Sequence, residues 1–132
     1  MSVRQIQWGL AAVFFTLGGW ALLAPQHAID TTILPKWNTG DPLTRFAMGC
    51  FGAQACLAGL FVAFSRFTPT TFLAYGIALL PFFAFNWWFT FIEPVFNMLG
   101  LIDAIGNVVM LGLCIYGWRQ AHREAAQIPD LQ

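Results

Sequence analysis

Six polar residues lie within or beside long apolar stretches of this chain: Arg45, Gln54, Asn86, Glu93, Asp103 and Asn107. An ionised side chain at the centre of a membrane helix costs about 2.5–3.5 kcal/mol on insertion scales, so such residues usually face a protein interior and satisfy one another. Asp103 and Asn107 are four residues apart and therefore share one face of a helix. We expect the six to form one polar cluster, in which Arg45 pairs with Asp103 or Glu93.

Such a cluster allows two interpretations. It could clamp the helices and fix their register, or it could line a ligand pocket that opens to the outer face. An aromatic wall for that pocket could come from Phe82, Phe85, Trp87 and Trp88, although lipid-facing Phe and interfacial Trp residues explain much of this run. Asp103 could also carry a proton, a role that a neighbouring Arg45 would oppose by keeping it ionised.

The composition indicates where these residues lie. Of the 132 residues, 58% are hydrophobic and only 9% are charged, with six Lys or Arg and six Asp or Glu. A soluble domain usually carries about 25% charged residues, and a nucleic-acid-binding surface needs a basic patch. The composition therefore predicts an integral membrane protein in contact with the lipid bilayer, and it excludes nucleic acid as a partner.

Four stretches with at most one charge each predict the elements that position the cluster. A bilayer core of about 30 Å requires about 20 helical residues, and all four stretches are long enough. Without water, each must satisfy its own backbone as a helix. We predict helices near 6–24, 43–64, 70–91 and 96–118, an outer loop over 25–42 and a cytoplasmic tail over 119–132. The fold class is all-α: an integral membrane four-helix bundle in a single domain, 1–132, whose first helix is retained rather than cleaved.

The Lys and Arg residues predict the orientation. Four of them fall on the side of the termini and two on the opposite side, which favours cytoplasmic termini. The two groups are Arg4, Arg66, Arg119 and Arg123, and Lys36 and Arg45. In this topology Arg45, Glu93 and Asp103 form a layer near the outer interface, and Gln54, Asn86 and Asn107 form a second layer closer to the midplane.

Small residues predict how the helices pack. Gly49, Gly52, Cys56 and Gly59 are spaced by three, four and three residues, which places them on one face of the second helix. Small residues allow close approach of helix backbones in lipid. We interpret this face as an intramolecular seam, with a homodimer contact as the alternative.

The sequence offers no recognisable catalytic, metal or cofactor site. Its two histidines, His27 and His122, fall on opposite sides of the membrane, which argues against a bis-His haem or a di-iron site. The phosphate-binding, zinc-protease and hydrolase motifs are missing. The three cysteines lie within predicted helices and form no C-x-x-C pair, so a thiol oxidoreductase is not expected.

The overall pattern resembles small bacterial four-helix membrane proteins of the broad DoxX-like type. The resemblance consists of a Gly-containing first helix, a long outer loop, Thr44-Arg45-Phe46 opening a Gly/Ala-rich second helix, and a polar residue within the fourth. It implies an architecture and residence in the bacterial inner membrane as a multi-pass protein. It assigns no catalytic residue.

Three functions remain open from the sequence. The leading hypothesis is a non-catalytic protein that binds a lipid-like or quinone-like apolar molecule, or serves as an accessory subunit of a membrane-protein partner. The second is a membrane isomerase or other proton-transfer enzyme that uses Asp103 or Glu93 as its acid or base. The third is a component of a transporter.

Overall fold

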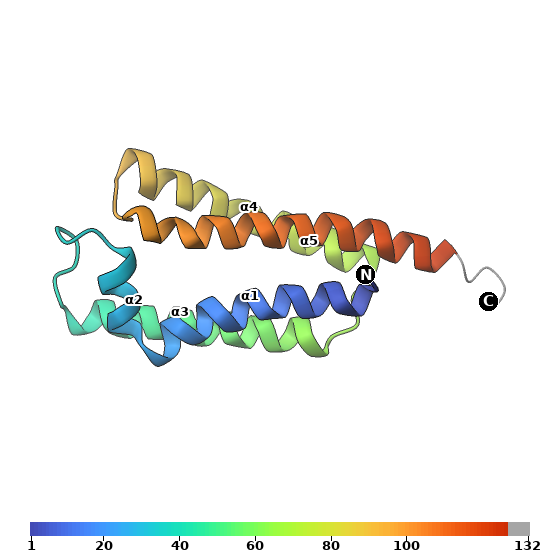
Figure 1. Cartoon of the computed structure of the whole chain (residues 1–132), viewed down its shortest axis with the longest axis horizontal. Helices are drawn as coiled ribbons and strands as arrows, with labels where there is room; N and C mark the ends of the chain where they lie inside the picture. Colours follow the sequence, from blue (N-terminus) through green and yellow to red (C-terminus); the bar gives the residue numbers. More distant parts are fainter. Residues whose placement is uncertain (127–132) are drawn as a thin grey trace.

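The chain is all-helical in the computed structural model, which describes residues 1–126 (Figure 1). The elements are α1 (Val3–Leu23), α2 (Pro25–Thr32), α3 (Pro42–Phe64), α4 (Pro69–Trp87), the π-helical turn η1 (Trp88–Ile92), the 3-10 turn η2 (Met98–Gly100) and α5 (Leu101–Ala126). Within residues 1–126 there is no strand, only an isolated bridge between Ile33 and Phe96. The all-α prediction is confirmed.

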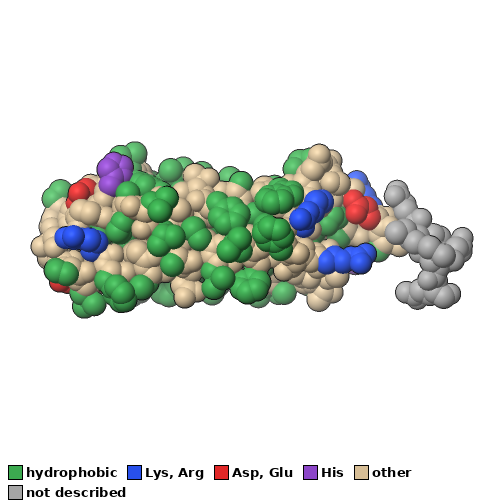
Figure 2. Space-filling model, turned by 90° about the horizontal axis from the view of Figure 1, so that it is seen from below, with side chains coloured by type: hydrophobic (Ala, Val, Ile, Leu, Met, Phe, Trp, Pro, Cys, Tyr) green, Lys and Arg blue, Asp and Glu red, His purple; other side chains and the backbone are tan. Residues whose placement is uncertain are grey.

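Four of the helical segments are long and apolar enough to cross a membrane. They are Val3–Leu23, Pro42–Phe64, Pro69–Ile92 and Met98–Ala126. Apolar side chains cover the middle of the molecule, and the charged side chains lie towards its two ends (Figure 2). The N-terminus and the end of α5 lie at the same end (Figure 1). These features indicate a multi-pass membrane protein.

Local signals in the sequence account for where the long helices begin. The Asp41 side chain accepts a hydrogen bond from the backbone two residues on, and Pro42 occupies the first turn of α3. Thr68 caps α4 in the same way, in a reciprocal pair with Thr71, and Pro69 follows it. A proline in the first turn loses no helical hydrogen bond, and the caps satisfy backbone N–H groups that the helix leaves free.

The helices form three sides of a four-sided arrangement. Helix α1 packs against both α3 and α5, and α4 packs against α5. Helices α3 and α4 make no extensive contact with each other in the described part of the chain, although the short 65–68 connection joins them at the end near the termini. The order around the molecule is therefore α3, α1, α5, α4, and the side between α3 and α4 is open.

Glycines set the closest contact, between α1 and α3. A Cβ atom added at Gly52 would lie 2.7 Å from the carbonyl oxygen of Gly18, and one added at Gly18 would lie 2.6 Å from the Cβ of Ala55. Gly59 lies against Phe14 of α1, but Gly49 has nothing within 4 Å. Because α1 ends opposite Gly52, the small-residue face continues past the contact, and Gly49 takes no part in it.

The segment predicted as an outer loop contains the helix α2, which was not expected. Pro25 ends α1 and also occupies the first turn of α2. The backbone N–H of Leu34 donates to the Val95 carbonyl at 2.8 Å, and the Asn97 side chain donates to the Thr31 carbonyl at 2.8 Å. These bonds hold α2 against the α4–α5 connection, where the two segments together form a cap over this end of the molecule. They are tertiary contacts, which local sequence signals do not reveal.

One helix end also differs from the prediction, because α5 runs to Ala126 rather than ending at 118. The third span ends at Ile92, one residue beyond the predicted end, and its last turn is π-helical. The predicted tail is therefore helical as far as Ala126, where Ala121 is buried and Gln120 donates to Glu124 at 3.2 Å. The rest of that predicted tail lies outside the described residues.

We expect Gly52→Ala to destabilise the protein. The new Cβ would meet the backbone of α1, so the helices must separate, at a cost of about 1–3 kcal/mol in the free energy of unfolding. Gly49→Ala, on the same helix, is the matched control and should gain up to about 1 kcal/mol from helix propensity. Unfolding monitored by circular dichroism in increasing denaturing detergent would compare them. Equal stability of the two variants would contradict this packing.

A second prediction concerns Asp30 in α2. Asn38 and Gln26 donate to its Oδ1 at 2.7 and 2.8 Å, and these bonds, with a smaller effect from the charge of Arg45, hold the pKa of Asp30 below its usual 3.8. Asn38→Ala should raise that pKa towards 3.8, whereas Thr39→Ala should leave it unchanged. A carboxyl NMR titration measures both.

The lowered pKa of Asp30 determines how its contribution to the stability of the folded protein depends on pH. Asp30 stabilises the loop at neutral pH, and this contribution is lost as the pH falls through the pKa of the folded protein. An Asp30 pKa that is the same with and without Asn38 would show that this hydrogen bond does not form in solution.

Candidate functional site

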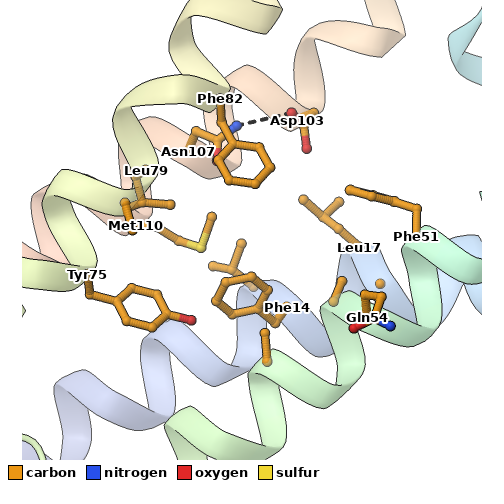
Figure 3. Close-up of a pocket in the computed structure, with 15 residues that line it drawn as sticks. Phe14, Leu17, Phe51, Gln54, Tyr75, Leu79, Phe82, Asp103, Asn107 and Met110 are labelled. Atoms are coloured by element: carbon orange, nitrogen blue, oxygen red, sulfur yellow. Dashed lines mark hydrogen bonds between the residues drawn. The ribbon is translucent and has the colours of Figure 1, made fainter.

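The open arrangement encloses two adjoining cavities. The first has a volume of about 460 Å³ and receives side chains from all four long helices (Figure 3). The second, of about 470 Å³, lies nearer the α2 cap, where Trp20, Ala28 and Phe96 contribute to its wall. Both cavities are lined by Leu17, Phe51, Phe82 and Asp103. Asp103 therefore lies at their junction.

Asp103 is held by two amides, one from its own helix and one from the neighbouring helix. Its Oδ2 atom accepts hydrogen bonds from Asn86 Nδ2 of α4 at 2.8 Å and from Asn107 Nδ2 of α5 at 3.0 Å. Both asparagines are buried, with 8% and 2% of their surfaces exposed. The other carboxylate oxygen, Oδ1, points into the first cavity (Figure 3). Half of the carboxylate thus joins α4 to α5, and half remains accessible.

The orientation of the Asn86 amide is set by its surroundings. Its nitrogen donates both to Asp103 and to the carbonyl oxygen of Phe82, at 2.9 Å, and both of these partners are acceptors. The amide oxygen must therefore point the other way, where it is buried without a hydrogen-bond partner. A buried polar atom without a partner costs about 1–3 kcal/mol, so such atoms often mark a place where a ligand or water binds.

The structure brings together four of the six predicted cluster residues. Asn86, Asp103 and Asn107 are hydrogen-bonded, and Gln54 of α3 lies on the opposite wall of the first cavity. Arg45 and Glu93 are exposed and line neither cavity.

The expected ion pair of Arg45 with Asp103 or Glu93 is absent from residues 1–126, so that prediction is wrong. Asp103 belongs to α5 and Arg45 to α3, two helices that do not pack against each other because α1 and the cavities separate them. Asp103 takes its hydrogen bonds from amides on its own side of the cavities.

Only two of the four residues predicted to form an aromatic wall line the cavities. Phe82 lines both cavities and Phe85 lines the second. Trp87 and Trp88 lie on the outer surface, with 55% and 48% exposed, and line neither cavity. Their positions suit the lipid-facing interpretation.

The sequence reasoning missed Tyr75. This residue lines the first cavity, and its ring contacts Phe14 and Phe67 at centroid distances of 6.2 and 5.8 Å, which closes the cavity towards the termini. Its spacing could have revealed it. Tyr75, Leu79, Phe82 and Asn86 follow one another at intervals of four, three and four residues, so they share one face of α4.

Gln7 was missed as well. It is buried near the termini, and its amide donates to the carbonyls of Val62 and Ser65 at 3.0 and 2.9 Å. These carbonyls lie at the end of α3, where the helix leaves them without internal partners. Gln7 therefore attaches α1 to the end of α3.

No protein-family model, curated protein or solved structure matches this chain. The DoxX-like resemblance stays a prediction.

The lining of the cavities limits that chemistry. Among the described residues, Asp103 is the only Asp, Glu, Lys, Arg or His that lines either cavity. Within residues 1–126, no group of three His, Cys, Asp or Glu side chains is placed to hold a metal ion. The arrangement is a largely apolar space with a few convergent polar groups, which is typical of small-molecule binding sites.

We expect Asn107→Leu to lower the free energy of unfolding by about 1.5–3 kcal/mol, because it removes a hydrogen bond to a half-buried carboxylate. Gln54→Leu is the control from the opposite wall and should be neutral or stabilising. Adding Asp103→Leu to Asn107→Leu should recover part of the loss, since no carboxylate is then left unsatisfied. Denaturation in detergent measures all of these variants, and equal stability of the first two would contradict the bond.

Proposed function

We propose that this protein binds an apolar, lipid-like molecule in the two adjoining cavities and holds its polar group at Asp103, alone or as an accessory subunit of a membrane-protein partner. The observation that carries the proposal is the junction itself: two apolar cavities of about 460 and 470 Å³ meet at a carboxylate with one free oxygen. Volumes of about 300–1,000 Å³ are usual for small-ligand sites.

The open side of the helix arrangement supports access from the bilayer. Helices α3 and α4 make no extensive contact, and the exposed rings of Phe51, Phe82 and Phe85 line the cavities on these two helices. In a membrane this side faces acyl chains. A molecule already dissolved in the lipid could reach Asp103 by moving sideways between α3 and α4.

Both ends of the cavities are covered, which favours binding over transport. The α2 cap lies over one end, and Tyr75 with Phe14 and Phe67 closes the other. A transporter would need a path towards the termini, where the buried Phe67 and Phe72 pack together at a centroid distance of 4.9 Å.

A proton-transfer enzyme is the second candidate, favoured by the same carboxylate. Asp103 is free of an ion pair and borders both cavities, as an acid or base acting on an apolar substrate would. Glu93, the other carboxylate considered, is exposed and outside the site. Apart from Tyr75, no other acid or base among the described residues lines the cavities to exchange a proton in concert with Asp103. We therefore favour binding over catalysis. Conversion of a bound molecule that stops in Asp103→Asn would reverse this ranking.

We also propose residence in the bacterial inner membrane with both termini in the cytoplasm. Four of the six Lys and Arg residues belong to the end of the molecule that holds the termini, and positively charged residues concentrate on the cytoplasmic side. The open side of the site would then face the outer leaflet.

Filling the first cavity should remove the bound molecule. We expect Ala58→Trp, on the cavity wall, to lower the amount of apolar molecule that co-purifies after mild extraction by at least about fivefold, since an indole would occupy part of the space. Ala53→Trp, on the exposed face of the same helix, is the matched control and should retain the wild-type amount. Mass spectrometry of the organic extract measures it.

A second cavity-filling variant tests the same prediction if Ala58→Trp does not fold. Ala78→Trp fills the same cavity from α4, where the alanine is exposed and the added bulk is more easily accommodated. Circular dichroism would establish that each variant folds. The same amount of the same molecule in the wild type and all three variants would contradict binding in this cavity.

A further inference from the structure

We infer that the molecule bound at Asp103 presents a hydrogen-bond donor, a hydroxyl or an ammonium group, and not a carbonyl, carboxylate or phosphate. This inference rests on the proposed function and names the chemistry of the head group. It narrows a quinone-like ligand to its hydroxyl-bearing, reduced form. It follows from which polar atoms around Asp103 are already engaged and which are free.

The atom that Asp103 offers to a ligand is an acceptor. Asp103 directs Oδ1 into the first cavity, while its Oδ2 takes both amide hydrogen bonds (Figure 3). The Asn86 oxygen and the Thr90 hydroxyl are also without a partner, but both atoms are fully buried and are not exposed to the cavities. The free Asp103 oxygen is satisfied by a group that donates hydrogen bonds.

The amide donor of Asn86 is not available to a ligand. Its nitrogen already donates to Asp103 and to the carbonyl of Phe82, and an amide nitrogen has two hydrogens. Turning the amide over would place its oxygen against two acceptors. The acceptor character of this corner is therefore built into the α4–α5 contact and does not depend on a choice of side-chain orientation.

The charge of the site also favours a head group that donates hydrogen bonds. No Lys, Arg or His among the described residues lines either cavity, so nothing there offsets the Asp103 carboxylate. A phosphate or carboxylate head group would meet a like charge in a low-dielectric space, where repulsion is strong. A carbonyl would direct its lone pairs at the free carboxylate oxygen. A head group that donates hydrogen bonds avoids both kinds of repulsion.

Two other lining groups can donate, the second amide hydrogen of Asn107 in the first cavity and the Thr44 hydroxyl in the second. Neither carries a charge that would offset the carboxylate. The Gln54 amide on the opposite wall can donate or accept, so it tolerates either kind of head group. The Tyr75 hydroxyl can donate, but it lies eleven residues before Asn86 in α4, which is about 16 Å along the helix. The donor-binding end of the site is therefore the junction, and the apolar part of the ligand extends away from it.

Probes with one chain and different head groups would test this inference. Dodecanol, dodecyl methyl ether, dodecylamine, dodecyltrimethylammonium and dodecanoate share the same chain but differ in donor and charge. Each would carry a terminal trifluoromethyl group and be titrated into lipid nanodiscs holding the full-length protein, with binding followed by fluorine NMR. Nanodiscs with Ala58→Trp would measure partition into the lipid alone, which is subtracted.

We expect the alcohol to bind at least about tenfold more tightly than its methyl ether, and the amine at least about tenfold more tightly than its trimethyl form, because each second member lacks the donor. Dodecanoate should bind most weakly. The relative affinities of the two donor probes identify the head group. Stronger binding of the amine assigns an ammonium group, and equal or stronger binding of the alcohol assigns a hydroxyl.

Asp103→Asn should lower the affinity for the preferred donor probe by about tenfold or more. The methyl ether should not lose affinity, because the amide nitrogen that replaces Oδ1 can donate to the ether oxygen. Glu93→Gln, which removes an exposed carboxylate outside the site, should change neither. The wild-type probe series does not use Asp103→Asn, so it decides the inference even if that variant does not fold.

The outcomes separate the two proposals. If the methyl ether or dodecanoate binds as tightly as the alcohol, the donor inference is overturned and binding in the cavity stands. If no probe binds the wild type beyond its partition into Ala58→Trp nanodiscs, the proposed function is contradicted, and the inference fails with it.

Discussion

A carboxylate can lie inside an apolar helix assembly only if the protein replaces the water it has lost, and for Asp103 two asparagines do so. Asn107 comes from the same helix one turn on, which leaves the rotation of the neighbouring helix free. Asn86 comes from α4, so its bond fixes both the depth and the rotation of α4 against α5. Tyr75 and Phe82 lie on the same face of α4 as Asn86, so this bond helps to turn them towards the cavities.

The cavities arise because the close contacts lie elsewhere. The backbones of α1 and α3 approach each other where Gly18 meets Gly52, and the Phe72 ring of α4 packs against the α5 backbone at Gly117. Both contacts join helices into pairs, and α1 against α5 joins the pairs. No comparable small-residue contact draws α3 towards α4. Large rings at Phe51 and Phe82 occupy the facing positions instead, and space remains behind them.

The sequence predicted what depends on single segments. Hydropathy located the four spans, and the pairs Asp41-Pro42 and Thr68-Pro69 located two helix starts. Depth in the membrane could also be predicted, because it follows from position along a helix. Rotation about the helix axis could not, since it is decided by partners on other helices. Arg45 and Asp103 were therefore assigned to one layer, but they face different directions.

The polar cluster had two interpretations, a structural clamp and a ligand site, and the geometry of Asp103 supports both at once. A clamp needs only one carboxylate oxygen, and Oδ2 receives both amides. A carboxylate whose sole role was structural would gain from engaging its second oxygen, because an acceptor left without a partner in an apolar space is costly. Yet Oδ1 faces a cavity, and the Asn86 oxygen nearby is also without a partner. A carboxylate oxygen without a partner at the junction of two cavities is best explained by a third group that binds there and donates a hydrogen bond to it.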